Sequence, residues 1–227
     1  MKNWNVLENQ ITPRILRVVG AAALAVTLTI SLPQAAHADP VTPPPVPAEL
    51  EVDAGYRAFL VGHAVGTQNY VCLPTGSGFV WTLFTPQATL FEDNHRQVVT
   101  HFFGPNLSPI PPEEIAGTIR AAWQDSRDTS TVWGQVKPGD SSSDPAFVAP
   151  GAIPWLLVTV VGAQDGPTGG HTLTATTFIQ RLNTAGGVAP TTGCTLSTDV
   201  GHQAFVPYTA DYFFYKAAPG NGAGDGN

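Results

Sequence analysis

The sequence predicts an all-β fold, either a single-domain β-sandwich or a closed β-barrel. Short segments rich in β-branched and aromatic residues follow one another along the chain. Clusters of Gly, Pro, Asp and Asn separate them, and no segment keeps a helical hydrophobic period. Short, regularly spaced strands without strong helices are typical of both architectures. We favour the sandwich and keep the barrel as the alternative.

The predicted strands differ in how they should be buried. Residues 153–161, IPWLLVTVV, are apolar on both faces, as expected for a central strand that is covered on each side. Residues 171–182 begin with the alternating HTLTATTFI, which predicts one face on the core and the other in water. The remaining predicted strands are residues 69–73, 79–84, 88–91, 97–103 and 205–215.

A hairpin is predicted near the middle of the chain. Apolar residues alternate over 119–123 and again over 131–133, and the Asp- and Ser-rich QDSRDTS between them is turn chemistry. The hairpin is therefore a better interpretation than a helix. The following residues 137–145, KPGDSSSDP, are predicted to be a loop.

The first 38 residues have the composition of a secretory signal peptide. Lys2, Arg14 and Arg17 precede an apolar run over 18–32, and Ala36-His37-Ala38 places small residues at the cleavage positions. The run of 15 residues is shorter than the ~20 that a bilayer core needs. We therefore expect cleavage after Ala38 and a secreted or periplasmic product with no membrane span in its mature form.

Cleavage would divide the rest of the chain into three parts. Removing 38 of the 227 residues leaves 189, enough for one domain with a hydrophobic core. We expect a Pro-rich spacer over 39–49, the all-β domain over 50–216, and a Gly-rich disordered tail over 217–227.

The charge balance argues against nucleic acid as a partner. The net charge is −7 for the whole chain, and it becomes −9 when three basic residues and one acidic residue leave with the signal peptide. The seven remaining basic residues are scattered from Arg57 to Lys216, whereas a phosphate backbone is gripped by clustered Lys and Arg. An anionic membrane surface is disfavoured for the same reason.

Several sequence blocks carry a family resemblance. In order they are NYVC, VWTLFTPQATL, HFFGP, AWQDSRDTSTVWG, APGAIPWLLV, RLNTAGGVAPTTGC and VPYTADYFFY. From about Leu50 to Lys216 the chain resembles a family of exported bacterial and fungal proteins catalogued as domain of unknown function 3455. The resemblance implies export and a common fold, and it implies no reaction.

Catalytic signatures are weak. Gly139-Asp140-Ser141, followed later by Asp199 and His202, has the order of GDS-type serine hydrolases. In those enzymes the serine opens a helix after a buried strand, whereas here Lys137-Pro138 precedes it and a Ser-rich stretch follows. Coincidence is the favoured interpretation.

No metal or other cofactor is expected. Five histidines follow the predicted cleavage site, and none forms a close pair with ligand spacing; they are His63, His95, His101, His171 and His202. His101, in the VVTHFFGP block, is kept as a candidate ligand-binding residue. Its alternative interpretation is a histidine held by a backbone partner.

Trp123, Trp133 and Asp128 are the other candidate ligand-binding residues. If the two tryptophans face each other across the hairpin, their stacked surface could hold a sugar or another flat ligand. Core packing is the favoured alternative for both. Asp128 lies in the predicted turn, where an Asp side chain commonly binds its own backbone.

The two cysteines are predicted to form a disulfide, Cys72–Cys194. Residues 181–194, RLNTAGGVAPTTGC, have the glycines of a tight turn and end at Cys194. Export would place both thiols in an oxidising compartment. A catalytic thiol is disfavoured because no basic residue lies within several positions of Cys194.

These features favour an exported, non-catalytic protein that has a binding or structural role in the cell envelope or outside the cell. Its ligand is unknown, and a glycan or another envelope component is the candidate. The alternative is a secreted hydrolase or metal-dependent enzyme whose site is assembled from separated loops.

Overall fold

The computed structural model describes residues 41–111 and 115–220. Nearly all of the regular structure in this part of the chain is strand. The elements are η1 (Ala48–Leu50), β1 (Tyr56–Thr75), β2 (Gly78–Phe91), β3 (Gln97–Pro105), β4 (Ile119–Asp125), β5 (Thr131–Ser142), β6 (Trp155–Gln164), β7 (Phe178–Gly186), η2 (Ser197–Asp199) and β8 (Gln203–Ala217).

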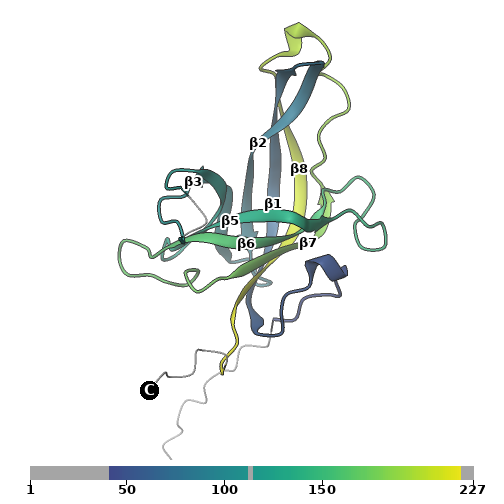
Figure 1. Cartoon of the computed structure of the whole chain (residues 1–227). Helices are drawn as coiled ribbons and strands as arrows, with labels where there is room; N and C mark the ends of the chain where they lie inside the picture. The colour runs from purple at the N-terminus through teal and green to yellow at the C-terminus, as the bar shows by residue number, and fades with distance from the viewer. Residues whose placement is uncertain (1–40, 112–114, 221–227) are drawn as a thin grey trace, which may run out of the picture. The chain divides into compact units, whose positions relative to one another are not determined.

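The strands form a closed antiparallel barrel (Figure 1). Each strand pairs with the next along the chain, and β8 returns to pair with β1 from Tyr56↔Ala217 to Val71↔Gln203. The all-β prediction is confirmed, in the form of the barrel alternative rather than the favoured sandwich. The physical reason is the β1–β8 pairing, which removes the two edges that an open sheet would expose.

Three strands continue past one end of the barrel (Figure 1). β2 pairs with β3 only over Ala88–Phe91, whereas it pairs with β1 along its whole length. Residues 67–75 of β1, 78–87 of β2 and 203–207 of β8 therefore form a three-stranded extension. A register shift at Asn69/Tyr70 bends it.

The barrel interior holds an inner cluster of buried side chains. Its members come from all eight strands and from the segments that contain Ile153 and Leu173, and they meet inside the closed sheet. The largest of them are Trp123, Tyr208, Tyr212, Phe214, Leu90, Leu173 and Ile179.

An outer cluster covers the opposite face of β6, β7, β8 and β1. It joins Leu50, Val148, Trp155, Leu157, Leu182, Phe213 and Tyr215. Val41 and Val46 of the Pro-rich segment pack against it, and the carbonyl of Leu50 accepts a hydrogen bond from Gln180 Nε2 at 2.6 Å. The segment before β1 thus covers the outside of the barrel.

Three strand boundaries differ from the sequence predictions. Residues 171–177 were predicted as the start of a strand, yet they form turns before β7, with Thr176 Oγ1 bound to the Leu173 carbonyl. Residues 137–142, predicted as loop, continue β5 past an irregularity in its pairing with β6. The first part of β1, residues 56–68, has no predicted counterpart because glycine and alanine interrupt its pattern.

The predicted signal peptide, residues 1–38, lies outside the described residues, as does the tail from residue 221. Within residues 41–111 and 115–220, no helix has the length and apolar character needed to cross a bilayer.

Candidate functional site

A cavity of about 250 Å³ opens at the barrel end from which the extension projects. We call it the mouth cavity. Its walls are Leu83, Pro86, Phe103, Ala121, Gly134, Val136, Leu156 and Val158, and its polar or aromatic lining is Gln68, His101, Trp123, Arg181 and Tyr212. Leu83 and Val136 are each 37% exposed and form part of the rim, whereas His101, Trp123 and Tyr212 are buried. The lining is therefore mostly apolar, with a few convergent polar groups, as is typical of ligand sites.

Three aromatic rings form the floor of the mouth cavity. The His101 imidazole stacks on the Trp123 indole with 4.4 Å between centroids and 9° between planes. The Tyr212 ring lies against both, at 5.2 Å from His101 and 5.9 Å from Trp123. The three come from β3, β4 and β8, and β3 and β4 bring His101 directly opposite Trp123. The floor is a flat aromatic surface.

A glycine makes room for the Trp123 indole. Gly134 stands on β5 next to this floor, and a Cβ at that position would overlap Val158 and come within 3.1 Å of Trp123 Cζ3. Any side chain at residue 134 would therefore press on the floor.

His101 is held neutral. Its Nδ1 lies 2.9 Å from the Ala122 carbonyl, which can only accept, so Nδ1 carries the hydrogen and Nε2 is left as an acceptor. Burial lowers the pKa of His101 to about 3, against the opposing effect of this hydrogen bond. The imidazole can stack and accept a hydrogen bond at neutral pH, but it is a weak base.

Arg181 brings a positive charge to the mouth cavity. Its Nε and Nη2 donate to the Pro154 carbonyl at 3.2 and 2.8 Å. Burial raises the pKa of Tyr212, and the Arg181 charge acts in the opposite direction on that phenol. Burial likewise raises the pKa of Tyr208, whose hydroxyl lies 3.3 Å from that of Tyr212. The guanidinium therefore faces neutral phenols rather than an anion.

Two buried nitrogens near the cavity lack a well-formed hydrogen bond to any described residue, namely Trp123 Nε1 and Gln68 Nε2. The Gln68 amide does lie close enough to the Tyr208 hydroxyl to act on its pKa. The Trp123 nitrogen has no hydrogen-bond partner among the described residues. Because buried donors are nearly always paired, these two atoms mark a region where bonds remain to be made. Trp155 Nε1, in the outer cluster, is a third atom of this kind.

The two candidate tryptophans do not face each other. Trp123 is opposite Val132 and Trp133 is opposite Ala122, so their side chains point to opposite faces of the sheet. Trp123 is 1% exposed and Trp133 is 5% exposed. The exposed stacked pair is therefore wrong, and core burial is the correct interpretation for both. Only Trp123 lines the mouth cavity.

Asp128 stabilises loops at the other end of the barrel. Its Oδ1 accepts from the Ser130 amide at 2.8 Å, and its Oδ2 accepts from the amide and hydroxyl of Thr172 at 2.9 and 2.7 Å. Partial burial would raise the pKa of Asp128, but these hydrogen bonds hold it well below its usual range. A second hollow there, about 410 Å³, is lined by Asp128 and by Glu92 and Arg96, which pair with each other. Asp125 and Arg127 also line this hollow, and the carboxylates of Asp125 and Asp128 are engaged with backbone amides of the turn.

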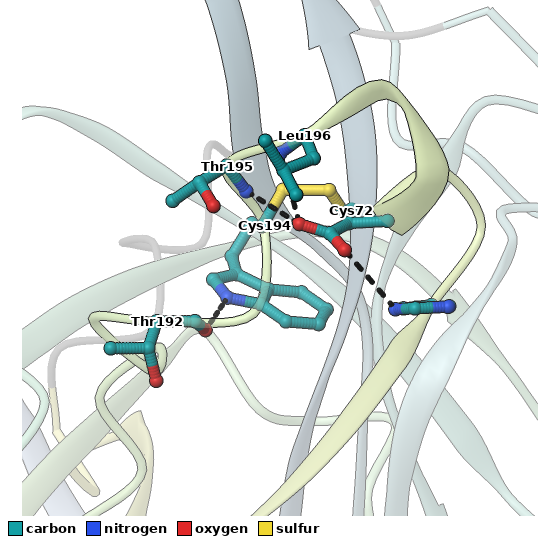
Figure 2. Close-up of a disulfide and its surroundings, with 8 residues drawn as sticks. Cys72, Thr192, Cys194, Thr195 and Leu196 are labelled. Carbon is teal, nitrogen blue, oxygen red and sulfur yellow. Dashed lines mark hydrogen bonds and ion pairs between the residues drawn. A yellow bond between two sulfur atoms is a disulfide. The ribbon is translucent and has the colours of Figure 1, made fainter.

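The disulfide joins Cys72 on the extension to Cys194 in the loop after β7, with 5.5 Å between their Cα atoms (Figure 2). The loop is held further by Trp81 Nε1, which donates to the Thr192 carbonyl at 3.0 Å. Asp199 Oδ2 accepts from the amides of Thr195 and Leu196 at 2.8 and 2.9 Å. Asp199 is therefore engaged in shaping this loop.

The hydrolase-like motif lacks its expected context. Gly139-Asp140-Ser141 lies inside β5, without the helix that a nucleophile serine would open. Nor do the described residues contain a group of three or more His, Cys, Asp or Glu side chains arranged to hold a metal.

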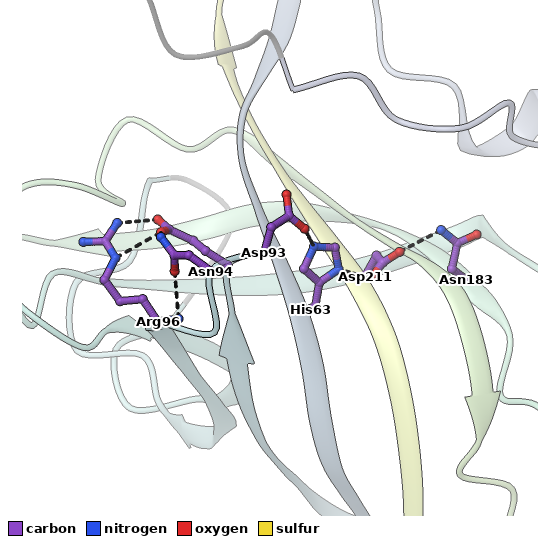
Figure 3. A network of polar contacts seen from close by, with 7 residues as sticks. His63, Asp93, Asn94, Arg96, Asn183 and Asp211 are labelled. Carbon is purple, nitrogen blue, oxygen red and sulfur yellow. Dashed lines mark hydrogen bonds and ion pairs between the residues drawn. The ribbon is translucent and has the colours of Figure 1, made fainter. Parts of the chain in front are cut away.

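His63 forms the main polar network on the outer surface (Figure 3). Its Nδ1 lies 2.6 Å from Asp211 Oδ1 and its Nε2 lies 3.0 Å from Asp93 Oδ1. Asn183 Nδ2 donates to Asp211 Oδ2 at 2.7 Å. Burial acts to lower the pKa of His63, but the two carboxylates outweigh it and the pKa is raised. Both ring nitrogens already have partners, so this network ties β1, β7 and β8 together.

The sequence patterns did not indicate Gln68, Arg181 and Tyr212 as site residues. Arg181 opens the RLNTAGG block, but in the sequence it is one of the scattered basic residues. Its charge becomes notable only because β7 places it at a cavity whose described lining contains no carboxylate. The alternation in 205–215 did contain a signal for Tyr212, since Tyr208, Ala210, Tyr212 and Phe214 share one face.

The fold and this site define a small closed antiparallel β-barrel with an aromatic-floored cavity at one end. The chain belongs to the family described as "Protein of unknown function (DUF3455)", whose model matches residues 53–216. No curated protein and no solved structure gives a significant match to the chain.

Proposed function

We propose that the protein is an exported, non-catalytic binding protein that holds a small organic ligand in the mouth cavity. The observation that carries this proposal is the aromatic floor of His101, Trp123 and Tyr212 beneath an apolar wall at an open barrel end. At about 250 Å³ the cavity lies just under the ~300–1,000 Å³ of sites for drug-sized ligands. It suits a ligand of one or two fused rings.

Binding is favoured over catalysis by the chemistry of the lining. The described residues around the mouth cavity include no Ser, Cys, Lys, Asp or Glu that could act as a nucleophile or a carboxylate acid–base. Tyr212 has a raised pKa, and His101 has a pKa of about 3, so neither is poised for proton transfer near neutral pH. A sugar ligand is less favoured, because Trp123 and Trp133 are buried on opposite faces.

Export rests on the N-terminal sequence and agrees with the disulfide. Disulfides persist in oxidising compartments, and the two cysteines of this chain are joined to each other. The mature protein is expected to begin at Asp39, directly after the Ala36-His37-Ala38 site. Intact-mass measurement of the exported protein tests this expectation, and recovery of the uncleaved chain from the membrane fraction would contradict it.

Calorimetric titration with 2-naphthol, a neutral planar probe, tests the cavity. We expect one binding site per chain. Val136→Trp should block the rim and abolish binding, because Val136 is exposed at the mouth. Val80→Trp is the matched control, since Val80 is an exposed valine of β2 outside the cavity lining.

Two results would contradict the binding proposal. One is the absence of saturable 2-naphthol binding to a folded protein. The other is binding that Val136→Trp and Val80→Trp affect equally, which would place the probe elsewhere on the surface.

A further inference from the structure

We propose that the ligand of the mouth cavity is a small organic anion, with a flat apolar body on the aromatic floor and a carboxylate paired with Arg181. This inference rests on the proposed binding function and adds the chemical class of the ligand.

The charge of Arg181 is the first observation. No carboxylate among the described residues lies within ion-pairing distance of its guanidinium. The Pro154 carbonyl takes Nε–H and one Nη2–H, and the Tyr212 hydroxyl lies close enough to hydrogen-bond to the guanidinium, so this five-donor side chain still has N–H groups to offer a ligand. Half-buried charges are normally compensated by an opposite charge. A bound carboxylate would supply it.

The surroundings of Arg181 are the second observation. The guanidinium acts on the pKa values of four groups: His101, Tyr70, Tyr208 and Tyr212. All four are neutral at physiological pH, because burial lowers the pKa of the histidine and raises those of the phenols. Arg181 therefore gives the cavity a positive potential that its own lining does not cancel.

The apolar lining determines the rest of the ligand. Leu83, Pro86, Phe103, Leu156 and Val158 form walls that an inorganic anion would not use. A flat ring on the floor would bury apolar surface against the Trp123 and Tyr212 rings, which favours stacked or edge-on aromatic contacts. A planar carboxylic acid combines both requirements, whereas phosphate satisfies only the charge.

The test compares 2-naphthoate with 2-naphthamide, a neutral molecule of the same shape. Calorimetry should give one site per chain for the acid and an affinity about 10- to 100-fold weaker for the amide, as expected when a charge-assisted pair is lost. Arg181→Gln should remove the preference for the acid. Arg57→Gln, which removes an exposed arginine of β1 outside the cavity lining, should retain it.

Several outcomes would overturn the anion assignment. Equal affinity for acid and amide, or an acid preference that survives Arg181→Gln, would show that the charge plays no part. Competition by inorganic phosphate as strong as by 2-naphthoate would show that the apolar walls play none. If 2-naphthol binds but neither naphthoate nor naphthamide does, only the anion assignment fails, whereas loss of 2-naphthol binding removes the proposed function itself.

Discussion

The outer and inner faces of the barrel each bury a glutamine, and the two side chains differ in their hydrogen bonding. Gln180, in contact with the outer cluster, uses both ends of its amide: Nε2 donates to the Leu50 carbonyl at 2.6 Å, and Oε1 accepts from the Tyr215 hydroxyl. Gln68, on the inner face, is equally buried at 2% exposure, yet its Nε2 makes no well-formed hydrogen bond to a described residue. Gln180 is thus hydrogen-bonded at both ends of its amide within a packed region, whereas Gln68 has an N–H donor available beside a cavity.

The contrast indicates which face of the barrel has polar groups available to a ligand. On the outer face, the N-terminal segment closes the cluster, and Thr184 Oγ1 binds the Ile153 carbonyl at 2.6 Å. Trp155 Nε1 is the exception there. At the inner mouth, an arginine with no carboxylate partner among the described residues, the Trp123 nitrogen and the cavity occur together. Buried polar groups with unmet bonds that line a cavity point to a ligand more strongly than any single residue does.

The largest expected effect concerns neither face but the disulfide beyond the mouth. Its two cysteines are 122 residues apart, so reduction should release about 4–5 kcal/mol of loop-closure stabilisation in the chain-entropy model. Thermal unfolding with and without reductant measures this loss. The Cys72→Ser/Cys194→Ser double variant is the control and should show no further response to reductant. An unchanged melting temperature on full reduction would contradict the prediction.

The second effect is acid destabilisation through His101. Its pKa is about 3 in the folded protein and about 6.5 when unfolded, so the unfolded chain binds the proton first as the pH falls. The stabilisation is complete above pH 6.5 and should decline by about 1.4 kcal/mol per pH unit between 6.5 and 3. Urea denaturation from pH 7 to pH 4.5 measures the slope. His101→Gln should lower this slope by the contribution of one proton, about 1.4 kcal/mol per pH unit. An identical slope in the variant would show that His101 is not the group responsible.

The third effect compares the two glutamines directly. Gln180→Leu should cost about 1–3 kcal/mol, because the Leu50 carbonyl and the Tyr215 hydroxyl would lose their buried partner. Gln68→Leu should change stability by less than about 0.5 kcal/mol, since little bonding is lost. Chemical denaturation of both variants gives the two values. Equal losses of stability in the two variants would contradict the proposed difference between the outer and inner faces.

The smallest effect is that of His63, on the outer surface. Its raised pKa means that its pairing with Asp93 and Asp211 stabilises the fold below pH 6.5 and is lost as the pH rises through the folded value. The His63 side chain is 41% exposed, so solvent screening limits the gain to about 0.2–1 kcal/mol. The stability of His63→Gln relative to the native chain at pH 5.5 and pH 8.5 should show a deficit only at the lower pH. The pH dependence of stability contributed by His63 therefore has the opposite sign to that contributed by His101.

The sequence predicted those parts of the fold whose signals are local. The hairpin of β4 and β5 was recognisable because Asp125 and Asp128 cap the turn between two alternating segments, and both carboxylates do bind turn backbone. Barrel closure was not predictable in the same way. It depends on pairing between Tyr56 and Ala217, at opposite ends of the domain, and no periodicity encodes which strands become neighbours.

The site was only partly predictable, for a related reason. His101 and Trp123 were both candidates, and register brings them together. Trp133 was misplaced because a shift of one residue in the hairpin register sends a side chain to the opposite face. Arg181 had no local signal, since its role depends on its having no carboxylate partner among the described residues that surround it in three dimensions.

The most direct test of the central claim is the indole N–H spectrum of ¹⁵N-labelled protein during titration with 2-naphthoate. Trp123 forms the floor of the mouth cavity, whereas Trp133 lies on the outer face and Trp155 belongs to the outer cluster. We expect the Trp123 signal to shift and to saturate at one equivalent, while the Trp133 and Trp155 signals stay in place. A Trp123 signal that does not move, or equal small shifts of all three, would contradict it.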